Sequence, residues 1–134
     1  MGIYQNLANN DQEMSMIKGM LNSITNIQHG VSVEAGWWEG VDANDPNICA
    51  SKMCLIHSEV SEAMEGMRKD LMDDKLPHRK MEEVEMADVL LRIFDYAGAR
   101  KLDLGSALVE KMRYNINRED HKLENRAKEG GKKI

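Results

Sequence analysis

Two pairs of acidic residues lie at helical spacing on separate stretches of the chain. Glu59 and Glu62 form the first pair, and Glu85 and Asp88 form the second. Positions three apart are neighbours on a helix surface, and both pairs border the apolar face of a predicted helix. If these faces pack together, the four carboxylates converge, and two charges about 5 Å apart repel by roughly 3 kcal/mol at an effective dielectric of about 20. The pattern predicts a cation between them, and carboxylate oxygens suit Mg²⁺ or Mn²⁺.

A basic stripe further along the chain would complement such a site. Lys111, Asn115 and Arg118 share one helix stripe, and Tyr114 lies beside them. Cationic and amide groups that face a metal site suit a polyphosphate, whose oxygens accept their hydrogen bonds. Lys69, seven residues after the second glutamate of the first pair, is a further candidate for a phosphate contact. Its plain alternative is a solvated lysine.

Four helices, divided by turn signals, are expected to position these residues. Their expected ranges are 11–28, 46–71, 78–99 and 103–120. A loop over 31–44 holds the adjacent pair Trp37 and Trp38, and the charged segment 121–134 is expected to be frayed or disordered. Short connections between amphipathic helices predict an all-α antiparallel four-helix bundle, with residues 1–120 as one domain.

Length, composition and charge exclude several classes of protein. The chain has 134 residues, 42% hydrophobic and 31% charged, and no apolar run approaches the about 20 residues of a membrane span. A formal net charge of −5 argues against a broad grip on a nucleic-acid polymer. The first residues lack the features of a secretory signal, and Cys49 and Cys54 have neither disulfide nor CxxC spacing. We therefore expect a cytoplasmic protein with reduced thiols and no membrane insertion.

The acidic pairs and the basic stripe together resemble the motifs of a known family. It is the MazG-like all-α nucleoside triphosphate pyrophosphohydrolases, related to dimeric dUTPases and dCTP pyrophosphatases, and the resemblance runs from about Trp37 to Arg118. Residues 58–62 and 85–88 match the family pattern EExxE, spacer, ExxD, and residues 111–118 match its K-x-x-x-N-x-x-R element. Ser58 stands where the family has its first glutamate, a change that dCTP-type members tolerate.

The resemblance implies an activity and a role for each motif. The activity is Mg²⁺-dependent hydrolysis of a nucleoside triphosphate, with deoxynucleotides favoured, to the monophosphate and pyrophosphate. Water activated by the metal or by a carboxylate attacks the triphosphate, and Glu59 is the favoured base. The implied metal ligands and catalytic residues are Glu59, Glu62, Glu85 and Asp88. The implied ligands of the triphosphate and sugar are Lys111, Tyr114, Asn115 and Arg118.

The resemblance also implies a role for the tryptophans and an oligomer. Relatives of the dCTP type place an aromatic residue ahead of the first acidic helix, where it stacks on the base, and stacking suits any base. We expect one of Trp37 and Trp38 to stack on the base and the other to plug the open end of the bundle. Relatives associate with sites between subunits, so a homodimer or homotetramer is expected.

Other interpretations of the same residues remain open. A ferritin-like di-iron bundle needs a histidine three residues after an acid, which neither Glu62 nor Asp88 has. A non-enzymatic interaction module would use methionine-rich helix faces to bind a partner helix. The same fold could also cleave another phosphoanhydride, such as a nucleotide alarmone or a phosphoribosyl nucleotide. The tryptophan pair and Asn115 favour a nucleoside triphosphate.

Overall fold

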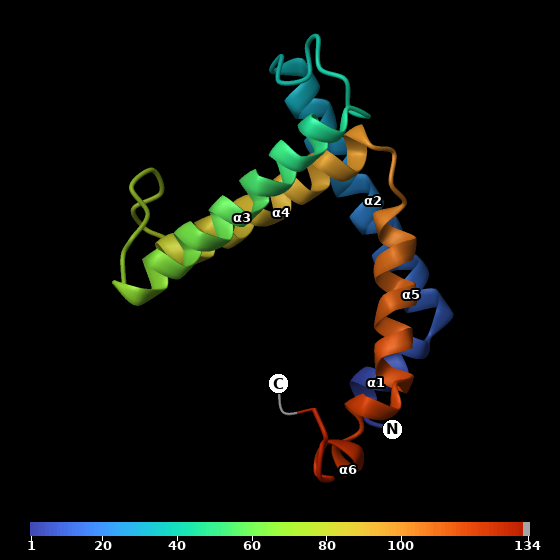
Figure 1. Cartoon of the computed structure of the whole chain (residues 1–134). Coiled ribbons are helices and arrows are strands. Elements are labelled where there is room, and N and C mark those ends of the chain that lie inside the picture. The colour runs from blue at the N-terminus through green and yellow to red at the C-terminus, as the bar shows by residue number, and fades with distance from the viewer. Residues whose placement is uncertain (133–134) are drawn as a thin grey trace. The chain divides into compact units, whose positions relative to one another are not determined.

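The computed structural model describes residues 1–132, and helices account for most of them. Within this part of the chain there is no strand beyond one isolated bridge between Met72 and Lys80. None of the helices in the described range is long and apolar enough to cross a membrane. The predicted all-α class is confirmed. The elements are α1 (Ile3–Asn9), α2 (Asp11–Glu34), α3 (Pro46–Arg68), α4 (Met81–Ala99), α5 (Leu104–Asn117), the 3₁₀ helix η1 (Glu119–His121) and α6 (Leu123–Arg126) (Figure 1).

The helices group into two compact units. The terminal unit comprises residues 1–23 and the chain from 103 onward, and the central unit comprises residues 24–102, so that α2 contributes to both. In the terminal unit the Asn22 side chain accepts a hydrogen bond from the Gly105 backbone at 2.9 Å and ties α2 to the start of α5. The charged segment 121–134, which the sequence predicts to be frayed or disordered, contains the short helix α6. The last two residues of this segment, 133–134, lie outside the described range. The apolar core of the terminal unit contains Ala8, Met14 and Val109, against which Ile17, Met112 and Ile116 pack.

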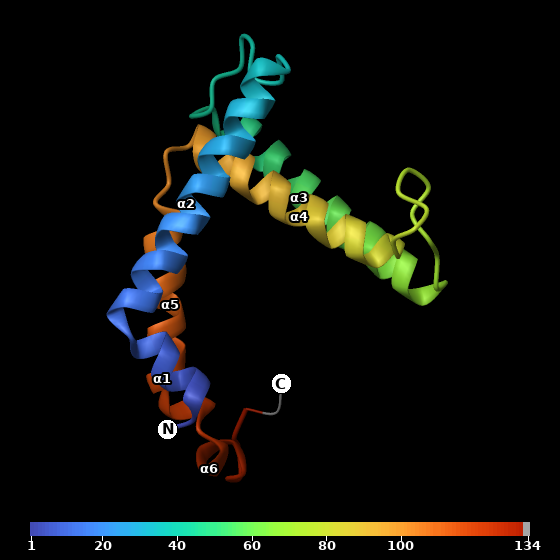
Figure 2. The ribbon, with the colours of Figure 1, turned by 180° about the vertical axis from the view of Figure 1, so that it is seen from behind.

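In the central unit, α3 and α4 lie side by side as an antiparallel pair (Figure 1, Figure 2). The start of α3 is as predicted, because Pro46 occupies its first turn and the Asp45 side chain accepts from the Asn47 backbone at 2.8 Å. Small residues allow the two backbones to approach closely. A Cβ added at Gly66 would lie 2.9 Å from the Cβ of Met81, so this contact requires glycine.

The predicted end of the first long helix is wrong. The sequence predicts an end at Gln28, ahead of Gly30, whereas α2 continues to Glu34. The next glycine, Gly36, lies two residues beyond Glu34 and terminates the helix with a φ of +84°. The Gly36 amide donates to the Val33 carbonyl, and the Trp37 amide donates to the Ser32 carbonyl. This is the glycine-terminated Schellman arrangement, and it fixes the direction in which the chain leaves at Trp37.

Four smaller boundaries also differ from the prediction. The helix α1 (Ile3–Asn9) was not predicted, and Asn10 separates it from α2 while its side chain accepts from the Gln12 and Glu13 backbones. The second, third and fourth expected helices are shorter than predicted: α3 ends at Arg68, α4 begins at Met81 and α5 ends at Asn117. The intervening segment is held by Asp73, a buried residue whose side chain accepts from the backbone amides of Lys75 and Leu76.

Gly98 is expected to be essential for the packing of α2 on α4. A Cβ at this position would lie 2.4 Å from the Cβ of His29, so Gly98→Ala should lower the free energy of unfolding by about 1–3 kcal/mol. Gly30→Ala is the matched control, because no atom lies within 4 Å of the added Cβ, and it should stabilise the helix by roughly 0.5–1 kcal/mol. Urea unfolding of both variants measures the difference, and equal shifts would contradict the close approach.

Candidate functional site

Three carboxylates from two neighbouring helices meet in the central unit. Glu59 on α3 and Glu85 and Asp88 on α4 each offer an oxygen, and these oxygens lie within 4.8 Å of one another. Glu59 is 6% exposed and Glu85 is 9% exposed, while Asp88 is half-buried. Buried acidic residues of this kind need a partner of positive charge. Among the described residues, these three are the acidic, histidine or cysteine side chains that lie close enough together to bind one metal ion.

The helix pattern explains why these acids face inward. Glu59 shares the buried stripe of α3 with Ala63 and Gly66, which lie one and two turns further along. Glu85 is likewise buried on α4, and Asp88 follows it by three residues. Ala63 has a small side chain and Gly66 has none, so α4 can approach α3 and the acids of both helices come together. An isolated carboxylate at such a position would be strongly disfavoured.

The burial and negative charge of this group act on the titration of Glu85. Burial, a hydrogen bond with Glu59 and the negative charges of Glu62, Glu59 and Asp88 raise the pKa of Glu85 to about 7. The metal-free cluster therefore holds a proton near neutral pH. A divalent cation would remove the mutual repulsion, and a set of carboxylate oxygens without thiolate or imidazole fits Mg²⁺ or Mn²⁺.

The fourth predicted ligand, Glu62, occupies a different environment. It is exposed on α3, and it lies outside the group of three oxygens that approach within 4.8 Å. Its charge nevertheless contributes to the raised pKa of Glu85, so the side chain lies close enough to act on the cluster. The structure thus brings three of the predicted carboxylates together and leaves the fourth at their margin.

An arginine that the sequence analysis did not single out completes the cluster. The Nε of Arg92 donates to Oε1 of Glu59 at 2.5 Å, which joins α4 to α3 through a charge-assisted hydrogen bond. Arg92 follows Asp88 by four residues and therefore lies on the same stripe of α4. This spacing was the one signal available in the sequence.

A cleft with a volume of about 490 Å³ opens beside the cluster. That volume is within the range of pockets that bind small molecules, roughly 300–1,000 Å³. Negative and positive side chains line it together with an exposed aromatic ring. Its lining includes Trp37, Lys52, Glu59, Asp88, Arg92 and Asp95.

The two adjacent tryptophans have different surroundings. Trp37 is 69% exposed and lines the cleft. Trp38 is half-buried, and its Nε1 donates to Oδ1 of Asp95 at 2.9 Å. Its ring meets the His29 ring edge-on at 5.6 Å, and the Lys52 ammonium lies 4.4 Å from its centroid. Trp38 is therefore a packed residue, and Trp37 is free to meet a ligand.

The predicted phosphate ligand Lys69 lies at the C-terminal end of α3. Its Nζ forms an ion pair with Oε1 of Glu65 at 2.5 Å, and its side chain is largely exposed. Hydrogen bonding and charge from Lys69 lower the pKa of Glu65. An exposed pair of this type contributes little to stability, so the lysine can exchange partners readily.

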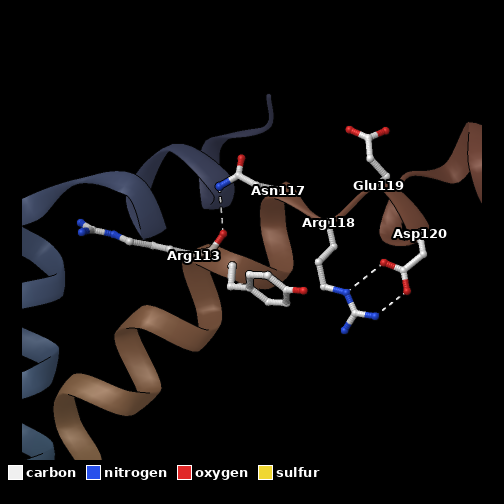
Figure 3. Close-up of a pocket in the computed structure, with 6 residues that line it drawn as sticks. Arg113, Asn117, Arg118, Glu119 and Asp120 are labelled. Atoms are coloured by element: carbon white, nitrogen blue, oxygen red, sulfur yellow. Dashed lines mark hydrogen bonds and ion pairs between the residues drawn. The ribbon is translucent and has the colours of Figure 1, made fainter.

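The remaining predicted ligands belong to the terminal unit. Lys111, Tyr114 and Asn115 lie on α5, and Arg118 follows its last residue. Lys111 Nζ lies 4.7 Å from the centroid of the Tyr114 ring, and Arg118 Cζ lies 5.7 Å from it. Arg118 faces Asp120, to which it donates from Nε at 2.9 Å and from Nη2 at 2.5 Å (Figure 3). Tyr114, Arg118 and Asp120 help line a cavity of about 680 Å³. The buried Oδ1 of Asn115 has no hydrogen-bond partner among the described residues.

The raised pKa of Glu85 predicts how stability depends on pH. The folded state of the metal-free protein binds this proton more tightly than the unfolded chain, whose glutamates titrate near 4.5. Its contribution to stability is present below about pH 4.5 and is lost as the pH rises through about 7, a loss on the order of 3 kcal/mol. Urea unfolding of chelator-treated protein across this range should show the loss. Glu85→Gln should abolish it, and an unchanged slope in that variant would contradict the assignment.

Comparisons of the chain with protein-family models, curated proteins and solved structures give no match. The likeness of its motifs to the MazG-like family is therefore a hypothesis from the sequence. The functional argument depends on the side chains that the central unit brings together.

Proposed function

We propose that the protein is a Mg²⁺-dependent nucleoside triphosphate pyrophosphohydrolase with a four-helix-bundle-like fold, acting in the cytoplasm. Its reaction is hydrolysis of a nucleoside triphosphate, with deoxynucleotides favoured, to the monophosphate and pyrophosphate. The observation that carries the proposal is the group of Glu59, Glu85 and Asp88, whose oxygens lie within 4.8 Å of one another. Glu59 and Asp88 line a cleft whose walls also include the basic side chains of Lys52 and Arg92 and the exposed Trp37.

In this mechanism the three carboxylates hold the metal, and Glu62 is the fourth proposed ligand. When bound, Mg²⁺ supplies positive charge that stabilises the charge developing on the phosphate oxygens. Glu85 must release its proton for the metal to bind, so affinity should rise with pH through about 7. Water attacks phosphorus, pyrophosphate leaves, and Glu59 accepts the proton of the water.

The proposal assigns recognition of the substrate to the remaining candidates. Trp37 is proposed to stack on the base, because it is exposed and lines the cleft. Trp38 is proposed to support it from its packed position. Helix spacing assigns a phosphate contact to Lys69. Helix spacing together with the motif resemblance assigns contacts with the triphosphate and sugar to Lys111, Tyr114, Asn115 and Arg118.

We also propose a homodimer or homotetramer. Large apolar side chains on both helices of the α3–α4 pair are more than about a third exposed, which is unusual for a helix pair that meets only water. Light scattering coupled to size exclusion should give a multiple of 15.2 kDa at micromolar concentration, and a monomer would contradict the proposal. The exposed residues include Met53, Val60, Met64, Met67, Met86 and Leu90.

The experiment that tests the proposed function is a pyrophosphate-release assay. A panel of ribonucleoside and deoxyribonucleoside triphosphates is incubated with the protein in Mg²⁺ and, as a control, in excess chelator. Release that requires Mg²⁺ is expected with at least one deoxynucleotide. Silence across the panel with Mg²⁺ binding intact would redirect the search to other phosphoanhydrides, such as nucleotide alarmones.

A second candidate function follows from the same exposed apolar residues. They would also suit a helical interaction module that binds a partner helix and carries out no chemistry. That function predicts that neither Mg²⁺ nor Mn²⁺ changes the melting temperature. The acidic cluster argues against it, because acids converging inside the α3–α4 pair serve no purpose in such a module.

A further inference from the structure

The ion pair between Arg92 and Glu59 joins two side chains of unequal burial. The Glu59 side chain is 8% exposed, whereas that of Arg92 is 41% exposed. A guanidinium carries five N–H donors, and only the Nε group contacts Glu59. Within the described residues, no hydrogen bond is formed by the Nη1 and Nη2 groups of Arg92. Four N–H donors of this permanently charged guanidinium are thus available at the wall of the cleft.

The Glu59 carboxylate would serve two cations if a metal ion bound to the cluster. Glu59 is one of the three carboxylates whose spacing suits a metal ion, and Arg92 already neutralises it in the metal-free chain. A divalent ion at this position would compete with the guanidinium for Glu59 and repel it. The Arg92 side chain is long, partly exposed and lines the cleft. It can therefore rotate away from Glu59 toward a ligand in the cleft while the α4 backbone stays in place.

We propose that Arg92 is a phosphate-binding residue that exchanges Glu59 for the polyphosphate of the substrate. Without metal it acts as the counter-ion of the buried carboxylate. When a divalent cation takes Glu59, the planar guanidinium binds phosphate oxygens in the cleft, a geometry for which arginine is well suited. The inference rests on the proposed function, because it places the polyphosphate beside the acidic cluster.

The alternative role for Arg92 is purely structural, and metal binding distinguishes the two. If Arg92 only orients Glu59, its loss should weaken metal binding. If it competes with the metal, Arg92→Gln should bind Mn²⁺ more tightly, by roughly tenfold in the dissociation constant. The same variant should bind pyrophosphate more weakly in the presence of Mn²⁺, also by roughly tenfold, because the phosphate contact is gone.

The experiment is a titration of the full chain with Mn²⁺, followed by pyrophosphate in excess Mn²⁺, using calorimetry. Arg68→Gln is the matched control, since this exposed arginine pairs with Glu65 at the end of α3 and its loss removes the same charge. Arg92→Lys, which keeps the charge without the guanidinium fork, should fall between Arg92→Gln and the unmodified protein. It also provides a test if the glutamine variant folds poorly.

The outcomes separate this inference from the proposed function. Weaker Mn²⁺ binding by Arg92→Gln, or an unchanged affinity for pyrophosphate, would overturn the role of Arg92. If Arg92→Gln binds Mn²⁺ more tightly and pyrophosphate more weakly, but the unmodified protein hydrolyses no nucleoside triphosphate, the Arg92 exchange stands and the proposed function is overturned. Turnover with an unchanged KM in Arg92→Gln would leave the function intact and overturn the exchange.

Discussion

Replacement of Asp88 by Asn is expected to slow Mg²⁺-dependent pyrophosphate release by at least about 100-fold. Asparagine has nearly the same shape but carries no charge, so the proposed metal site loses one of its three clustered carboxylates. The variant should nevertheless fold, because Asp88 is half-buried and its negative charge is unfavourable in the metal-free protein. That charge is one of the causes of the raised pKa of Glu85.

The same substitution should therefore move activity and stability in opposite directions. Removal of the Asp88 charge lowers the repulsion within the cluster, so the chelator-treated variant should be at least as stable as the unmodified protein at pH 7 to 8. Functional sites commonly store unfavourable charge in this way. A residue with a structural role would instead lose activity and stability together.

The control for this variant is Asp74→Asn, the same chemical change at an exposed position between α3 and α4. It should leave activity and stability close to those of the unmodified protein, as surface substitutions usually do. Pyrophosphate release at saturating Mg²⁺ and urea unfolding in chelator are the two measurements. Full turnover by Asp88→Asn with every triphosphate tested would refute the assigned role of the cluster.

Much of the helical framework could be predicted from the sequence because its signals are local. Aspartate is a favoured capping residue, and the side chains of Asp45 and Asp103 both accept from backbone amides of the first turn of the helix that follows. The spacing of the acidic pairs likewise follows from helix geometry, which fixes residues three apart on one face. These features need no knowledge of the rest of the chain.

Features that depend on tertiary contacts could not be obtained in this way. Gly30 and Gly36 are both plausible helix ends in the sequence, and the 6→1 hydrogen bond from Trp37 to Ser32 decides between them. The pairing of Arg92 with Glu59 depends on how α3 and α4 pack, because several cations on these helices have helical spacing to an acid. Sequence spacing identifies neighbours within one helix and leaves the choice between helices open.

The adjacent tryptophans provide the second large effect, and they should respond differently to the same substitution. Trp37→Ala is expected to raise KM for the preferred triphosphate by roughly 10- to 100-fold, the range for loss of one base–aromatic stack. Its stability should change little, because the ring is 69% exposed. Trp37→Phe should recover part of the affinity, since a smaller aromatic ring can still stack.

Trp38→Ala should instead lower the free energy of unfolding by about 2–3 kcal/mol, because the half-buried ring packs on His29 and binds Asp95. Steady-state kinetics and urea unfolding of the two alanine variants measure both effects. A larger rise of KM in Trp38→Ala than in Trp37→Ala, at a temperature where both are folded, would reverse the assignment. The contrast arises from the helix end at Gly36, after which the chain directs one ring into the cleft and the next against α4.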